Sequence, residues 1–89
     1  MKYFAALLYM LDEEKSRSLR PRHLAFLEER ESRGQVFARG PFTDGSGGLV
    51  IYCASSLEDA QELAGSDPYV VEHARRLELH EWAMKATLS

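Results

Sequence analysis

The hydrophobic pattern of the first third of the chain predicts a strand, a loop and a helix. Residues 2–10 are apolar at nearly every position, which is typical of a central strand that is covered on both faces. Residues 12–18 are charged and polar and are expected to form a loop. Apolar residues then recur at helical spacing over residues 19–33. Ser18 is the expected N-cap of this helix, with Pro21 in the first turn, where its missing N–H costs little.

Glycine and proline divide the rest of the chain into further elements. The glycine-rich turn after Pro41 favours an antiparallel hairpin between two β-rich runs. Ser55 and Ser56 both fit a capping box at the start of the helix that follows. The expected elements are strands over residues 35–42 and 49–53, a helix over 55–65, a short turn over 67–72 and a last strand over 74–86.

This order, β-α-β-β-α-β, predicts an α+β protein with the ferredoxin-like fold over a single domain, residues 1–89. Its four-stranded antiparallel sheet would carry two helices on one face. The other face would carry aromatic side chains that need a partner, and a sheet-to-sheet homodimer is the simplest solution. Burying ~500 Å² of apolar surface there would contribute on the order of 12 kcal/mol before the costs of association.

Composition and charge narrow the classes of function. The chain is 45% hydrophobic and 28% charged, as globular proteins are, and its net charge of −3 argues against binding nucleic acid. The apolar N-terminal run has no cleavage site and is too short to cross a bilayer, so we expect a cytoplasmic protein that binds no membrane. The single cysteine, Cys53, excludes an internal disulfide and is expected to pack in the core.

The most informative residue is His23, which interrupts the apolar stripe of the first predicted helix. At 100° per residue it shares about a third of the circumference with Leu19, Phe26 and Leu27. A histidine in that position faces the body of the protein. Its ring nitrogens must find a hydrogen-bond partner, because a buried polar group without one lowers the stability of the fold by about 1–3 kcal/mol. His23 is either a core histidine with a structural hydrogen bond or a residue of a functional site.

Asp67 is the candidate partner of His23. In a ferredoxin-like fold, the first helix and the segment before the last strand can lie at the same edge of the sheet. A carboxylate that accepts from one imidazole nitrogen fixes the tautomer and makes the other nitrogen a better base. The alternative reading of Asp67 is an N-cap for the turn that begins at Pro68. A carboxylate has enough lone pairs for both roles.

Other candidate sites have weaker patterns. The stretch Gly45–Gly48 could cradle an anion, but it has no P-loop lysine and a strand follows it, so a plain hairpin turn is favoured. His73, His80 and Cys53 match no zinc spacing, and we expect no metal and no cofactor. Three further residues could line a pocket, although packing or solvation explains them as well: Tyr9, Arg20 and Tyr69.

Three short motifs, taken together, resemble one family. They are Arg20-Pro-x-His23-Leu24, then Gly40-Pro41 with Asp44-Gly45, then Asp67-Pro68-Tyr69, in that order. The chain resembles the YciI-like (YCII-related) proteins over essentially its whole length. The resemblance implies a homodimer of the dimeric α/β-barrel kind, with an active site centred on His23 and Asp67. Its substrate-binding residues would be Arg20, Tyr69, Gly40, Pro41 and Tyr9.

Two functions are therefore expected. The first is a small cofactor-free enzyme, in which the His23–Asp67 pair moves a proton in an isomerisation or an elimination such as dehydrochlorination. Its substrate would be small and aromatic or lactone-like, because relatives in the family and the fold superfamily include a dehydrochlorinase and muconolactone isomerases. The second is a non-catalytic dimeric module that binds a small molecule, in which the pair only holds the first helix in place.

Overall fold

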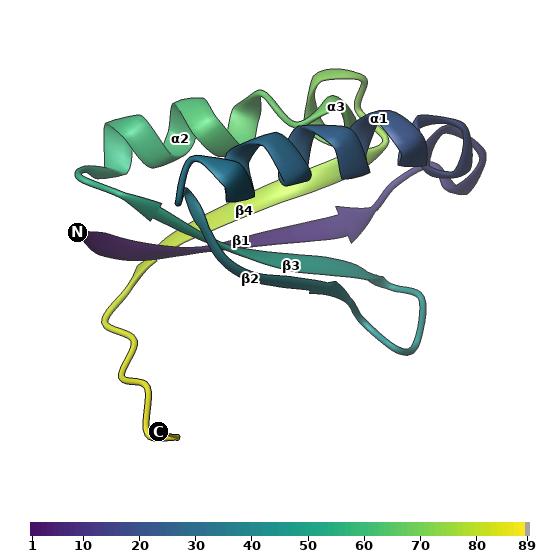
Figure 1. Ribbon diagram of the computed structural model, residues 1–89. Helices are drawn as coiled ribbons and strands as arrows, with labels where there is room; N and C mark the ends of the chain where they lie inside the picture. Colours follow the sequence, from purple (N-terminus) through teal and green to yellow (C-terminus); the bar gives the residue numbers. More distant parts are fainter. Residues whose placement is uncertain (89) are drawn as a thin grey trace.

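The computed structural model describes residues 1–88, which form one antiparallel sheet with a layer of helices on one face (Figure 1). The strands are β1 (Lys2–Met10), β2 (Val36–Pro41), β3 (Gly47–Ala54) and β4 (Arg75–Trp82). The helices are α1 (Glu13–Ser32), α2 (Leu57–Gly65) and the single turn α3 (Pro68–Val71). The element order and the four-stranded sheet confirm the predicted ferredoxin-like fold. No helix within residues 1–88 is long and apolar enough to cross a membrane.

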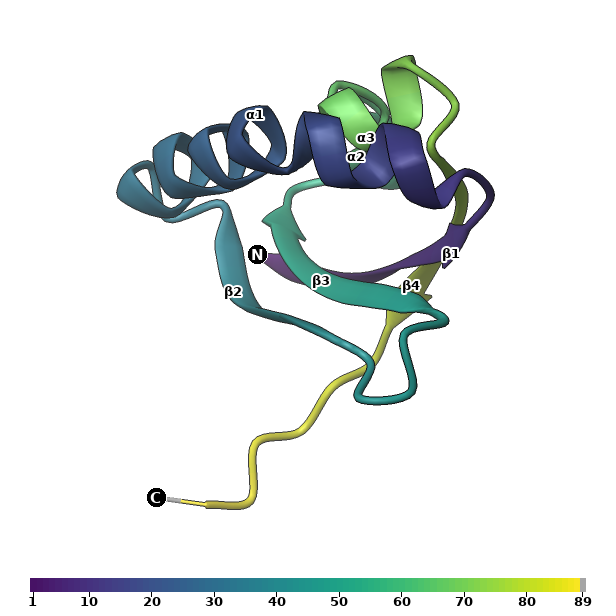
Figure 2. The same cartoon turned by 90° about the vertical axis from the view of Figure 1, so that its right-hand side faces the viewer.

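The sheet has the strand order β2-β3-β1-β4, and every neighbouring pair is antiparallel. The central strand β1 is nearly all apolar, although the helices cover only one of its two faces. Phe4, Ala6 and Leu8 are buried beneath the helices, whereas Tyr3 and Tyr9 belong to the alternate positions on the other face. Figure 2 shows that all three helices lie on the same side of the sheet.

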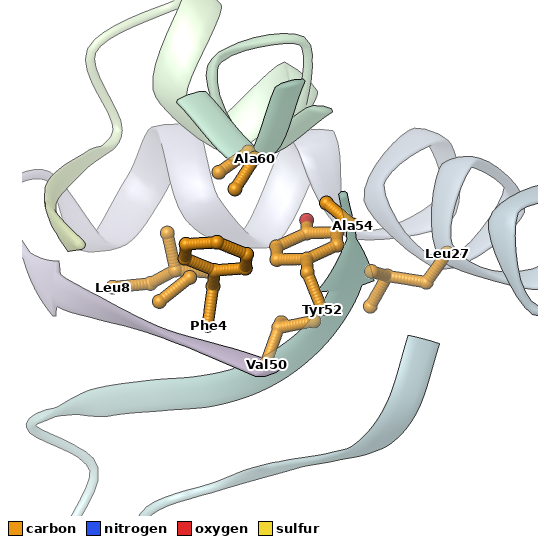
Figure 3. Close-up of a cluster of buried hydrophobic side chains, with 9 residues drawn as sticks. Phe4, Leu8, Leu27, Val50, Tyr52, Ala54 and Ala60 are labelled. Carbon is orange, nitrogen blue, oxygen red and sulfur yellow. The ribbon is translucent and has the colours of Figure 1, made fainter. Parts of the chain in front are cut away.

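The core lies between the sheet and the helices (Figure 3). Phe4 of β1 and Tyr52 of β3 contribute the largest buried rings, and Leu27 of α1 lies beside them with 1% of its surface exposed. Ala60 and Ala64 are the buried residues of α2, and their small side chains let this helix approach the sheet closely. Full burial of each large side chain contributes about 1.5–3 kcal/mol. The position of α1 over the sheet is thus set by its apolar stripe.

The first helix begins six residues earlier than the sequence pattern predicts, so the expected loop over residues 12–18 and the Ser18 N-cap are wrong. Asp12 is the N-cap, and its carboxylate accepts from the backbone N–H of Lys15 at 2.9 Å. Ser18 instead donates to the carbonyl oxygen of Lys15 within the helix. The first turns are polar because residues 13–18 are exposed apart from Ser16. Buried Ser16 donates to the distant carbonyl oxygen of Ala74, a tertiary contact that the local pattern does not reveal.

Two further expectations about element bounds are corrected. Pro21 lies in the interior of α1 and not in its first turn, so it removes one N–H from the helical ladder near Arg17. The last strand was expected over residues 74–86 but ends at Trp82. Residues 83–88 lead away from the sheet in both ribbon views, where no neighbouring strand pairs with them (Figures 1 and 2).

Gly47 is the position where β3 approaches β1 too closely for any side chain. Its φ is +153°, and a Cβ built there would lie 2.1 Å from the backbone oxygen of Leu8. We expect Gly47→Ala to lower the free energy of unfolding by about 3 kcal/mol, because backbone must shift to admit the methyl group. Chemical denaturation followed by circular dichroism measures this change.

Gly65→Ala is the matched control, because nothing lies within 4 Å of the added Cβ at the end of α2. Alanine should raise the unfolding free energy there by up to about 1 kcal/mol. Equal losses of stability in the two variants would contradict the close approach at Gly47.

Candidate functional site

His23 projects from α1 toward the sheet. It shares the buried face of the helix with Leu19 and Leu27, one turn before and one turn after it, as helical spacing requires. Only 9% of its surface is exposed. The stripe that packs α1 on the sheet therefore carries the imidazole into the protein and fixes its orientation.

Asp67 lies in the two-residue segment between α2 and α3, with no exposed surface. As the sequence predicts, Asp67 is the N-cap of α3 and Pro68 is the first residue of that helix. The Asp67 carboxylate accepts from the backbone N–H of Tyr69 at 2.9 Å. One function of this buried acid is thus to begin the short helix.

The same carboxylate contacts the imidazole of His23. Nδ1 lies 2.9 Å from both Oδ1 and Oδ2 of Asp67. Because an ionised carboxylate can only accept, Nδ1 carries the proton and Nε2 of the neutral ring has a free lone pair. Within residues 1–88, every buried side-chain nitrogen and oxygen has a hydrogen-bond partner, whereas Nε2 of His23 has none. An atom without a partner is therefore not a buried one. Nε2 is therefore the solvent-accessible nitrogen of the pair.

Tyr69 forms the second support of the imidazole. Its ring stacks on the ring of His23, with centroids 3.9 Å apart and planes inclined by 14°. The guanidinium of Arg75 lies 4.4 Å from the centroid of the Tyr69 ring, and its Nε donates to Ser16 Oγ at 3.0 Å. Burial raises the pKa of the Tyr69 phenol above its ordinary value, although Arg75 and Arg20 partly oppose that shift. The phenol therefore stays protonated near neutral pH.

A pocket of about 100 Å³ opens beside His23, between α1 and the β2–β3 side of the sheet. Its lining includes four of the five residues expected to bind a substrate: Arg20, Gly40, Pro41 and Tyr69. Tyr9 is not part of this lining, which corrects that expectation. It lies on the face of the sheet away from the helices, where the guanidinium of Arg76 is 4.6 Å from its ring centroid.

Two arginines of the pocket, Arg39 and Arg75, were missed by the sequence analysis. Strand alternation from Val36 would turn Arg39 away from the helices, but a β-bulge between Val36 and Ala38 reverses the alternation. Arg39 therefore pairs in register with Val50 of the core. Arg75 could have been found, because the alternation of Leu77 and Leu79 extends back to it.

The weaker candidates lie elsewhere. Cys53 is half-buried and lines a separate groove at the other end of α1, so the expectation that its thiol packs in the core is wrong. Of the stretch Gly45–Gly48, the first two residues lie in the turn of the β2–β3 hairpin and the last two begin β3. The Asp44 carboxylate accepts from the backbone N–H of Ser46 in this turn. His80 pairs with Glu78 at the surface. Among residues 1–88, no three histidine, cysteine or acidic side chains are grouped to hold a metal ion.

Comparison with known proteins identifies the family. The family model described as YCII-related domain matches residues 1–83. The chain is also 35% identical over 63 residues to an uncharacterised protein, YjpA, of Bacillus subtilis (strain 168), which covers 71% of this chain and 74% of that protein. The chain belongs to the YCII-related family, which confirms the resemblance drawn from its three motifs.

A solved structure has the same fold. It is 5-chloro-2-hydroxyhydroquinone dehydrochlorinase (TftG) from Burkholderia phenoliruptrix AC1100, in complex with 2,5-dihydroxybenzoquinone. The TM-score is 0.79, and the match covers 93% of this chain and 95% of that one at 17% identity. The likeness therefore extends over nearly the whole of both chains.

The geometry of the pair predicts what Asp67→Asn does to the imidazole. Asparagine can still accept from the Tyr69 N–H, but its amide can donate to Nδ1 of His23. We expect the neutral ring to shift from the Nδ1–H tautomer toward the Nε2–H tautomer, with folding retained. The ¹⁵N chemical shifts of the two ring nitrogens report this shift directly.

Glu78→Gln is the matched control, because it makes the same change beside the exposed ring of His80. There water competes for both nitrogens, so the tautomer balance should change little. An unchanged tautomer of His23 in Asp67→Asn would show that the carboxylate does not set the state of the ring.

Proposed function

We propose that this protein is a small enzyme that uses His23 as a general base and acid, with Asp67 holding the imidazole. The reaction is an isomerisation or an elimination, such as loss of hydrogen chloride, on a small organic substrate. The observation that carries the proposal is the accessible Nε2 of an imidazole whose Nδ1 contacts a wholly buried carboxylate.

In the proposed elimination, His23 removes a proton and the substrate loses a leaving group. Nε2 of His23 takes a proton from a carbon of the substrate, and the electron pair of that C–H bond forms a new double bond. The leaving group departs from the neighbouring carbon with its own bonding pair. His23 then returns the proton to water, so the substrate loses HX in total. In an isomerisation, the same proton returns to a different carbon.

Asp67 has a specific task in this step. When Nε2 takes the proton the ring becomes an imidazolium, and the adjacent carboxylate stabilises its charge. Stacking on Tyr69 keeps the ring in one plane, so little reorganisation accompanies the transfer. Support from outside this chain comes from the neighbour of the same fold, whose name describes removal of hydrogen chloride from a small phenolic compound.

Loss of His23 should strongly lower turnover without disrupting the fold. General acid–base groups contribute about 10²–10⁴-fold to rate, and we expect His23→Asn to lose at least the lower of these factors. The assay incubates the protein in D₂O with a panel of chlorinated hydroquinones and small lactones. Proton NMR detects exchange and rearrangement, and ion chromatography detects released chloride.

His80→Asn is the control for this experiment, because His80 also pairs with a carboxylate at 3.0 Å but lies at the surface. It should keep the activity of the unchanged protein. Equal activity in His23→Asn and His80→Asn would overturn the proposed base. If a compound of the panel binds in a His23-dependent manner and is never converted, the chain is instead a binding module.

We also propose that the enzyme is a homodimer that joins the helix-free faces of two sheets. Phe37 and Trp82 are 51% and 45% exposed on that face. Tyr3 lies between them, in register with Trp82, and its ring centroid is 5.3 Å from that of Phe37. A row of three aromatic rings across one sheet is an apolar surface of the kind that self-association buries.

A charge in this row should separate the proposed dimer. We expect Trp82→Arg to shift the protein toward the monomer in sedimentation velocity, with a dimer Kd raised by about 10²-fold or more, as hot-spot losses imply. Leu57→Arg is the control, because Leu57 is 44% exposed on α2 in the helical layer. A monomeric parent protein, or equal behaviour of the two variants, would contradict this assembly.

A further inference from the structure

The pocket beside His23 carries a charge opposite to that of the whole chain. The protein has a net charge of −3, yet three arginines line this one pocket: Arg20, Arg39 and Arg75. Among residues 1–88, no acidic side chain belongs to its lining. Such a concentration of cations in a small concave site attracts a negatively charged ligand.

The three arginines differ in whether a carboxylate already neutralises them. Arg39 donates to Glu31 of α1 through Nε at 2.5 Å, so its charge is compensated within the chain. Within residues 1–88, no carboxylate lies within 4.0 Å of Arg20 or Arg75. Two positive charges of the pocket therefore have no acidic partner among residues 1–88.

Both uncompensated arginines lie next to the proposed base. Arg20 precedes His23 by three residues, which places them on neighbouring parts of one helix surface. The guanidinium of Arg75 is held by Ser16 Oγ and by the ring of Tyr69, and that ring stacks on His23. These contacts hold Arg75 in place without using up all the donors of its guanidinium.

We propose that Arg20 and Arg75 bind an ionised oxygen group of the substrate, either a carboxylate or an acidic enol or phenol. This inference rests on the proposed function, because it names the substrate class of the same site. A guanidinium presents paired N–H donors in one plane, which match the two oxygens of a carboxylate or of adjacent ionised hydroxyl and carbonyl groups.

Phosphate is a poorer match for this pocket. At the start of α3, the N–H of Tyr69 is bonded to the Asp67 carboxylate and the N–H of Val70 to the Asp67 carbonyl oxygen, so this helix offers neither donor to an anion. A volume of about 100 Å³ also limits the bound part of the ligand to a small group. Binding the anion at the two arginines would place a neighbouring carbon of the substrate near Nε2 of His23.

The test measures binding of anions and of their neutral analogues by NMR titration at low ionic strength. Propionate is compared with propionamide for the carboxylate class, and 4-nitrophenolate with 4-nitroanisole for the phenolate class. We expect at least one anion to bind more tightly than its neutral analogue. Arg75→Met should weaken that anion about tenfold or more and leave the neutral compound unaffected.

Arg76→Met is the matched control. Arg76 is the next residue of β4 and also lies over a tyrosine ring, at 4.6 Å from the centroid of Tyr9, but on the other face of the sheet. It should leave anion binding unchanged. Equal affinity for charged and neutral analogues, or equal effects of Arg75→Met and Arg76→Met, would overturn the anion site.

The same experiment separates this inference from the proposed function. His23→Asn should still bind the anion, because the two arginines remain. If Arg75→Met binds the anion normally while His23→Asn loses turnover, the anion site is wrong and the base stands. If Arg75→Met loses the anion while His23→Asn keeps turnover, the base is wrong and the anion site stands.

Discussion

The contact between His23 and Asp67 is the interaction on which the rest of the site depends. A wholly buried carboxylate is costly unless its oxygens are hydrogen bonded, and here they accept from Nδ1 of His23 and from the N–H of Tyr69. Those two bonds join α1 to the start of α3, which are far apart in sequence. They also bring the ring of Tyr69 against the imidazole, and so determine where Arg75 can stack.

The sequence predicted the fold correctly wherever the signal lay in residues close to one another along the chain. Leu19, His23 and Leu27 identified the buried face of α1, and the Asp67-Pro68 step identified the entry to α3. The start of α1 was misread for a non-local reason. Ser16 is buried because it bonds to the carbonyl oxygen of Ala74, 58 residues later. A polar residue whose partner is that distant looks like part of a loop until the two segments are brought together.

The errors at Tyr9 and Arg39 have one physical origin, which is the uncertainty about which face of the sheet a strand residue occupies. The run that contains Tyr9 is apolar on both faces, so no alternation reveals that Tyr9 points away from the helices. The inward position of Arg39 could not be predicted, because a β-bulge changes which residues of β2 face the helices. His23 and Asp67 escaped this ambiguity because a helical stripe and a helix cap each assign a direction to a side chain without reference to a partner strand.

The arrangement of charge around the imidazole links the structural role of Asp67 to the proposed chemistry. Asp67 lies on the Nδ1 side of the ring, buried, and the uncompensated Arg20 and Arg75 belong to the pocket that His23 also lines. In the proposed reaction, a proton that reaches Nε2 creates a cation beside the carboxylate, while negative charge develops on a substrate that faces the arginines. Both charges then form next to groups of opposite sign, of which Asp67 and Arg75 are already held by contacts within the fold. Such preorganised electrostatics is worth more than the same contacts in water. In this mechanism Asp67, the N-cap of α3, would also keep the imidazole of His23 oriented between turnovers.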